Sequence, residues 1–164
     1  MVIFLHQKIR HFYLIDSKII IDGKLDELFW LDINPAKNFI MIEPINGKYE
    51  RSSQRTEVKF AYDNSAIYVS ASLYDSNPYE ILKELGPRDD QDKNTDMFGI
   101  FINPFNDGIN EFSFMVTAAG VQIDKRIVLT TDGYINELNW DAVWESEVVI
   151  NEKGWFVEMK IPYS

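Results

Sequence analysis

Apolar and polar residues alternate along much of this chain, which is the pattern of half-buried antiparallel strands. Many of the apolar positions hold β-branched or aromatic residues, which are common in strands. Turn residues such as Asn46-Gly47 and Asp132-Gly133 separate the alternating segments. The pattern predicts strands at residues 12–15, 18–21, 39–42, 57–62, 67–74, 97–102, 111–117, 121–129, 145–150 and 155–161.

Two short helical segments interrupt this pattern. Residues 26–30 predict a single helical turn, and residues 77–84 predict a second helix, with Asn77 as N-cap and Pro78 at the first position. No internal repeat or heptad pattern is present, which excludes solenoids and coiled coils. We therefore expect an all-β fold, a two-sheet antiparallel β-sandwich of immunoglobulin-like or jelly-roll-like type with one or two short helices.

The chain has 164 residues, which is enough for one domain with a substantial core. We expect residues 1–14 to be an N-terminal extension and residues 15–164 to be the domain. The apolar start at residues 2–5 is too short for a signal segment or a membrane span. Both ends are abrupt, so we expect the domain to be cut from a longer protein.

Charge and composition exclude several classes of function. The 26 Asp and Glu residues exceed the 16 Lys and Arg residues and give a net charge of -10, which repels the phosphates of nucleic acid or an anionic membrane. The chain has no Cys, which excludes a thiol nucleophile, an iron–sulfur cluster and a disulfide framework. The glycines are scattered singly, so no phosphate-binding loop is present.

The sequence offers little support for a catalytic site. The chain has no Gly-x-Ser-x-Gly motif, and its only histidines, His6 and His11, lie near the N-terminus. A glycosidase needs only two facing carboxylates, but the spacing of the acidic residues selects no pair. A haem site that pairs Met97 or Met115 with a histidine is a further alternative.

The acidic stretch at residues 88–96 is a candidate cation site. Asp90, Asp92, Asn94 and Asp96 offer oxygen ligands at every second position, and oxygen ligands favour calcium over zinc. The helix–loop–helix calcium signature is absent, because its required Gly and Glu positions are not met. A looser calcium site that also uses the turn at residues 106–108 is the alternative to a plain acidic loop.

Aromatic residues suit a sugar-binding surface, because sugars present apolar C–H faces that stack on flat rings. Of the four Trp residues, Trp140 lies among polar residues in the segment 136–141, whereas Trp30, Trp144 and Trp155 follow core patterns. Trp140 is therefore the first candidate for a platform.

The segment IDGKLDELFW at residues 21–30 resembles the opening IDG-x-LDE-x-x-W of carbohydrate-binding module family 9-like domains. The resemblance runs from about residue 15 to the end of the chain. It is closest to the variant at the N-terminus of large bacterial surface or outer-membrane proteins, many from Bacteroidetes. Further blocks in the expected order lie at residues 56–63, 66–69, 96–102, 119–124, 140–145 and 154–164.

The resemblance implies a β-sandwich outside the cytoplasm that binds sugar-chain ends between two aromatic rings, carries calcium and is not an enzyme. The first ring would be Tyr62, where relatives often have Trp, and the second would be Trp140 or Trp144.

The candidate hydrogen-bonding residues are Arg88, Gln122 and Asn139, although Arg88 also has Asp89 and Asp90 as possible ion-pair partners.

The leading hypothesis is a non-catalytic carbohydrate-binding module of a larger exported bacterial protein in the periplasm, outer membrane or cell surface. Its ligand would be an oligosaccharide or polysaccharide. The alternative is a structural or docking domain that binds no sugar and packs against a downstream membrane barrel or a surface partner.

Overall fold

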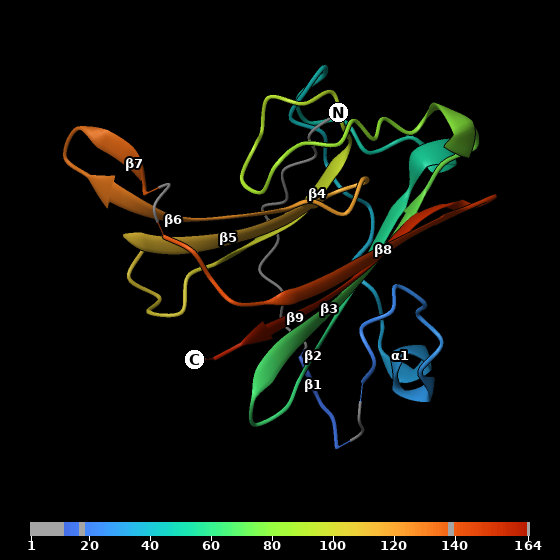
Figure 1. Ribbon diagram of the computed structural model, residues 1–164, viewed down its shortest axis with the longest axis horizontal. Helices are drawn as coiled ribbons and strands as arrows, with labels where there is room; N and C mark the ends of the chain where they lie inside the picture. Colours follow the sequence, from blue (N-terminus) through green and yellow to red (C-terminus); the bar gives the residue numbers. More distant parts are fainter. Residues whose placement is uncertain (1–11, 17–18, 138–139, 164) are drawn as a thin grey trace. The chain divides into compact units, whose positions relative to one another are not determined.

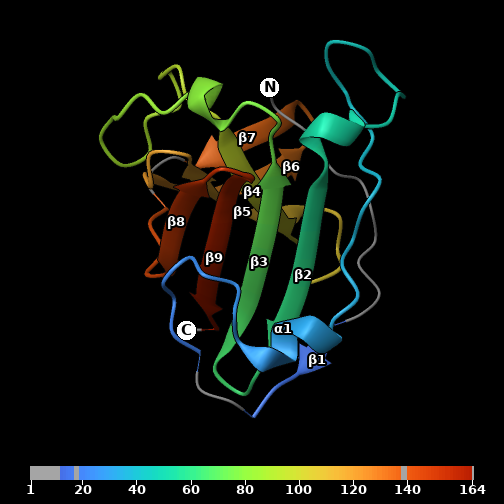
Figure 2. The ribbon, with the colours of Figure 1, turned by 90° about the vertical axis from the view of Figure 1, so that its right-hand side faces the viewer.

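The computed structural model describes residues 12–16, 19–137 and 140–163. Its strands form two sheets, one in the order β1-β2-β3-β9-β8 and the other in the order β4-β5-β6-β7 (Figures 1 and 2). The chain divides into two compact units, and each unit holds one sheet. The first unit extends to Ile81 and resumes at Trp144, and the second is Leu82–Val143. The predicted class, an all-β sandwich fold with two sheets and short helices, is confirmed.

The first unit contains the five-stranded sheet. Strand β1 runs parallel to β2, and the other neighbours are antiparallel. Helix α1 places Trp30 against Ala61, Ala66 and Tyr68 at the connected ends of β2 and β3 (Figure 2). The elements are β1 (Tyr13–Leu14), α1 (Leu28–Asp32), η1 (Ser52–Gln54), β2 (Thr56–Tyr62), β3 (Ala66–Tyr74), η2 (Pro78–Glu80), β8 (Glu145–Asn151) and β9 (Gly154–Pro162).

A buried carboxylate ties the IDGKLDELFW segment to the last strand. Glu158 on β9 is fully buried and accepts hydrogen bonds from the backbone N–H groups of Asp22 (3.1 Å) and Gly23 (3.2 Å). It also accepts one from Nε1 of Trp30 at 3.3 Å. Burial, aided by the nearby charge of Glu27, raises the pKa of Glu158 from 4.5 to about 7. Residues at both ends of the motif therefore depend on one side chain far away in the sequence.

The second unit is an antiparallel meander of β4 (Met97–Ile102), β5 (Asn110–Thr117), β6 (Gln122–Thr130) and β7 (Gly133–Glu137). Directly opposite residues project to the same side of a sheet. Phe114 is opposite Asp124, and Phe112 is opposite Arg126, which is itself opposite Glu137. We call the side that carries these five residues the aromatic face.

Two predicted strands are wrong. Residues 39–42 form only an isolated bridge, between Ile40 and Tyr49. These residues form one arm of a hairpin. Their alternation buries Phe39 and Met41 on one side of the hairpin and exposes Ile40 and Ile42 on the other. Residues 19–21 belong to no strand, and residue 18 lies outside the described residues.

The second predicted helix is confirmed only at its start. Pro78–Glu80 form a 3-10 helix with Asn77 at the N-cap position and Pro78 as its first residue, but Asn77 makes no side-chain capping bond. The helix cannot continue, because Lys83 bridges to Thr95 in an extended conformation. Strand β7 has no predicted counterpart, since most of its residues are exposed and show no alternation of burial. No helix in the described part of the chain is long and apolar enough to cross a membrane.

Candidate functional site

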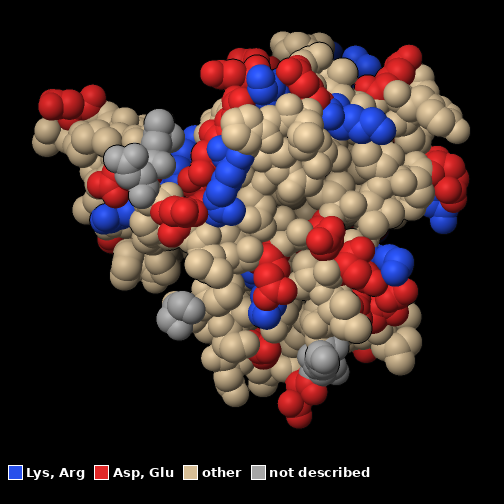
Figure 3. Space-filling view, viewed as in Figure 1, with Lys and Arg blue, Asp and Glu red and all other residues tan. Residues whose placement is uncertain are grey.

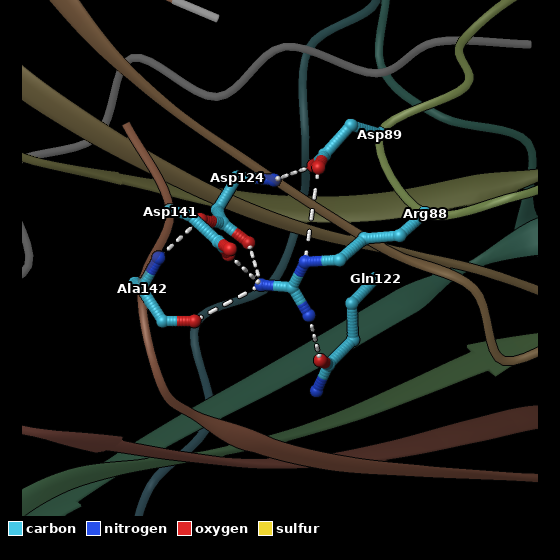
Figure 4. Close-up of polar contacts among 6 residues, drawn as sticks. All are labelled: Arg88, Asp89, Gln122, Asp124, Asp141 and Ala142. Carbon is cyan, nitrogen blue, oxygen red and sulfur yellow. Dashed lines mark hydrogen bonds and ion pairs between the residues drawn. The ribbon is translucent and has the colours of Figure 1, made fainter. Parts of the chain in front are cut away.

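Arg88 lies at the centre of a polar cluster in the second unit (Figure 4). Its Nη1 donates to Oε1 of Gln122 at 2.6 Å. Its Nη2 donates to Oδ1 of Asp124 and to the carbonyl oxygen of Ala142, the latter at 3.0 Å. Oδ1 of Asp141 is also 3.0 Å from Nη2. The guanidinium therefore connects β6 to the segment that follows β7.

Asp124 is the buried anchor of this cluster. Its side chain is fully buried, and Oδ2 accepts the backbone N–H of Ala142 at 2.7 Å. The backbone N–H of Asp124 donates to Oδ1 of Asp89 at 3.0 Å, and Asp89 adopts the left-handed conformation with φ 65°. A buried carboxylate is tolerated only when it is paired and hydrogen-bonded. Arg88 therefore stabilises Asp124, and together they fix the backbone at Ala142.

Trp140 lies two residues before Ala142 and packs on the aromatic face. Its ring centroid is 4.9 Å from that of Phe112 and 5.8 Å from that of Phe114. The residue is half-buried. Because Phe114 is directly opposite Asp124, Trp140 and the Arg88 cluster share one side of the four-stranded sheet.

The structure brings together three of the predicted ligand-binding residues, namely Arg88, Gln122 and Trp140. Asn139 lies outside the described residues, as do His6 and His11. Trp144 is buried and belongs to the first unit.

Of the two candidates for the second platform, Trp140 is therefore the less buried one. Trp30 and Trp155 are buried, as predicted.

Arg88 does contact Asp89, at 3.7 Å, but its closest carboxylate partner is Asp124. The sequence pattern holds a signal for this partner. Gln122, Asp124 and Arg126 occupy alternate positions of one strand, so they share a face of the sheet. Three polar residues in that arrangement indicate a polar surface that includes Asp124.

Tyr62 lies in the first unit, at the end of β2. It is half-buried, and its ring makes an edge contact with Phe12 at a centroid distance of 6.4 Å. The following residue, Asp63, accepts hydrogen bonds from Ser65 and from the hydroxyl of Tyr68. The role of Tyr62 as the first aromatic platform stays a prediction.

The structure describes hydrogen bonds that involve all three predicted calcium ligands. Asp90 accepts the backbone N–H of Asp92 at 2.9 Å and lies 3.7 Å from Nζ of Lys93. Asp96 accepts the backbone N–H of Leu82 at 3.3 Å. Among the described residues, no three His, Cys, Asp or Glu side chains gather as a metal site requires. Calcium binding therefore stays a prediction.

Surface charge is mixed on the side of the molecule shown in Figure 3. Asp and Glu side chains are spread among Lys, Arg and uncharged residues, and no broad basic area is visible. With a net charge of -10, this surface offers no footprint for a phosphate backbone.

Comparison with known families and structures gives a consistent result. The family described as "Carbohydrate family 9 binding domain-like" matches residues 21–164. Two solved structures of a carbohydrate binding module family 9 from Caldicellulosiruptor kristjanssonii are similar. The complex with cellotriose has a TM-score of 0.63 at 16% identity and covers 93% of this chain and 67% of that chain. The complex with glucose has a TM-score of 0.62 at 17% identity, with coverages of 93% and 68%.

At these identities the likeness shows a shared fold. A search of curated proteins gave no match.

Proposed function

This chain belongs to the carbohydrate family 9 binding domain-like family, and from this membership we propose that it is a non-catalytic module that binds an oligosaccharide or polysaccharide. The observation that carries the proposal is the placement of Trp140 and the Arg88 cluster on one face of the four-stranded sheet. An accessible aromatic ring beside fixed polar groups is the combination that sugar recognition needs.

The division of roles follows from the contacts. The apolar face of a sugar ring stacks on Trp140, and hydroxyl groups bond to Asp141, whose side chain is 73% exposed, and to the Arg88–Gln122 pair. Arg88 also holds the carbonyl of Ala142, so it fixes the segment that carries Trp140. A preformed platform loses little conformational entropy on binding, which raises affinity.

The proposal includes the cellular setting. We place the module in a larger exported bacterial protein, in the periplasm, outer membrane or cell surface, because its sequence blocks resemble domains of such proteins. The solved relatives are complexes with cellotriose and glucose, which makes glucans the first ligands to test.

The test is isothermal titration calorimetry with a panel of neutral mono- and oligosaccharides. We expect saturable binding that Trp140→Ala abolishes. Tyr134→Ala is the matched control, because Tyr134 is 74% exposed but lies opposite Leu129 on the other side of the same sheet. Absence of heat with every sugar at millimolar protein would refute the function, and an unchanged affinity in Trp140→Ala would refute the site.

One observation favours the docking alternative. The hairpin at residues 39–50 exposes Ile40, Ile42, Ile45 and Tyr49, and exposed apolar groups of this kind are typical of interaction surfaces. Hydrogen exchange of this hairpin, in the isolated chain and in the longer protein, tests the idea. Slower exchange only in the longer protein would support docking, and equal exchange would count against it.

A further inference from the structure

A second group of Arg, carboxylate and amide side chains lies on the aromatic face, one row beyond Asp124. Arg126 donates from Nη2 to Oδ1 of Asn110 at 2.7 Å and from Nη1 to Oε2 of Glu137 at 3.3 Å. Nδ2 of Asn110 donates in turn to Oδ2 of Asp107 at 2.8 Å. The guanidinium is thus oriented by contacts with β5 and β7.

This group is accessible. The side chains of Arg126 and Glu137 are 38% and 45% exposed, so both can meet a ligand. The contacts within the described residues do not use every donor, since the buried Nε of Arg126 has no partner there. An unsatisfied buried donor reduces stability, so this arrangement is not explained by stability alone.

The register places the second group beside Trp140. Arg126 is directly opposite Phe112, and Asp124 is directly opposite Phe114, while Trp140 contacts both rings. Arg126 and Asp124 are two positions apart on β6, so their Cα atoms are about 7 Å apart. Asp124 and Arg126 therefore lie in neighbouring rows of one face, and Trp140 contacts the aromatic residue of each row.

The charges of the two groups limit the ligand class. Around Arg88 lie Asp89, Asp124 and Asp141, and around Arg126 lies Glu137. These carboxylates outnumber the two arginines, so the face repels anionic sugars such as uronic acids.

We propose that Arg126, Asn110 and Glu137 form a second sugar subsite, so that the module binds neutral glycans of two or more units more tightly than the matching monosaccharide. This inference rests on the proposed carbohydrate function. Neighbouring hydroxyls of the second unit accept hydrogen bonds from the guanidinium and donate to Glu137, in the paired geometry that Arg and carboxylate groups provide.

The experiment compares chain lengths by calorimetry, with glucose, cellotriose, xylose, xylotriose, mannose and mannotriose as neutral probes and trigalacturonate as the anionic one. We expect Arg126→Gln to weaken binding of the preferred trisaccharide about tenfold, as for one lost hydrogen bond to a charged group, and to change monosaccharide binding less than twofold. Glu137→Gln, which keeps the size of the side chain, should give the same selective loss. Arg51→Gln, an exposed Arg in the first unit, is the matched control.

The outcomes separate this inference from the function on which it rests. Equal losses for mono- and trisaccharide, no loss for either, or tight binding of trigalacturonate would overturn the second subsite while leaving carbohydrate binding in place. If the wild-type protein binds no probe, the proposed function and the subsite both fail. Thermal unfolding of each variant shows whether a loss of binding reflects a loss of folding.

Discussion

Glu158 makes the stability of this protein depend on pH in a direction opposite to that of most carboxylates. The side chain is fully buried and accepts three hydrogen bonds, from Asp22, Gly23 and Trp30. Burial outweighs these bonds, and with the nearby charge of Glu27 it raises the pKa from 4.5 to about 7. We predict that Glu158→Gln removes a pH-dependent part of the unfolding free energy.

The sign and magnitude of this pH dependence follow from the difference in bound protons between the folded and unfolded states. Between pH 4.5 and about 7 the folded protein holds a proton on Glu158 that the unfolded chain has released. Stability therefore falls as the pH rises, by up to about 1.4 kcal/mol per pH unit. The stabilising contribution is fully present below pH 4.5 and is lost above about pH 7, a total of about 3 kcal/mol.

The assay is urea denaturation at several pH values from 5 to 8, followed by tryptophan fluorescence at constant ionic strength. Wild-type protein should lose stability across this range relative to Glu158→Gln, because the amide cannot ionise. The slope is the informative quantity, because the amide also changes the bond to Trp30 at every pH. Glu152→Gln, at an exposed position in the turn between β8 and β9, is the control and should keep the wild-type slope. Parallel profiles for wild type and Glu158→Gln would refute the reasoning.

Three further predictions test other parts of the structure. Asp124→Asn should lower the free energy of unfolding by about 1–3 kcal/mol and shift the Trp140 emission to the red, because Arg88 and the N–H of Ala142 lose a charged partner. Urea denaturation measures this loss, with Asp132→Asn at an exposed position as control, and equal stability of the two variants would contradict the prediction. Gly154→Ala should destabilise the folded protein by about 3 kcal/mol or more, because φ is 141° and a Cβ would lie 2.1 Å from the carbonyl oxygen of Leu73. Gly108→Ala, at φ 67° with no atom near the added Cβ, should destabilise it less, and similar melting temperatures for the two variants would disprove this. The predicted calcium site is tested by the melting temperature in millimolar calcium and in chelator. Binding to the folded protein raises this temperature, and Asp92→Asn should remove the rise. Equal melting temperatures of the wild-type protein in calcium and in chelator would contradict the calcium site.

Local pattern was sufficient for most of the strands. Alternation predicts β3 and β4 to within one residue, because burial of one face repeats every second position in the sequence itself. It fails for β7, which is exposed, and for residues 39–42, whose alternation reflects burial of a hairpin rather than membership of a sheet. Composition also separates Trp140 from the buried Trp residues, because its neighbours in the sequence are polar.

Only the tertiary structure decides which distant residues meet. Arg88 and Asp124 are 36 positions apart, and Asp22 and Glu158 are 136 apart. Alternation can place Asp124 on a polar side of its strand, but it does not predict which distant residue pairs with it. Both contacts depend on strand register and on where loops cross the sheets, which are set by packing of the whole chain. Family resemblance and local pattern thus predict the kind of protein and single out Trp140 among the four tryptophans. The polar groups around Asp124 and Arg126 share a face with that tryptophan only when β5, β6 and β7 are aligned, because register decides which side chains share a row.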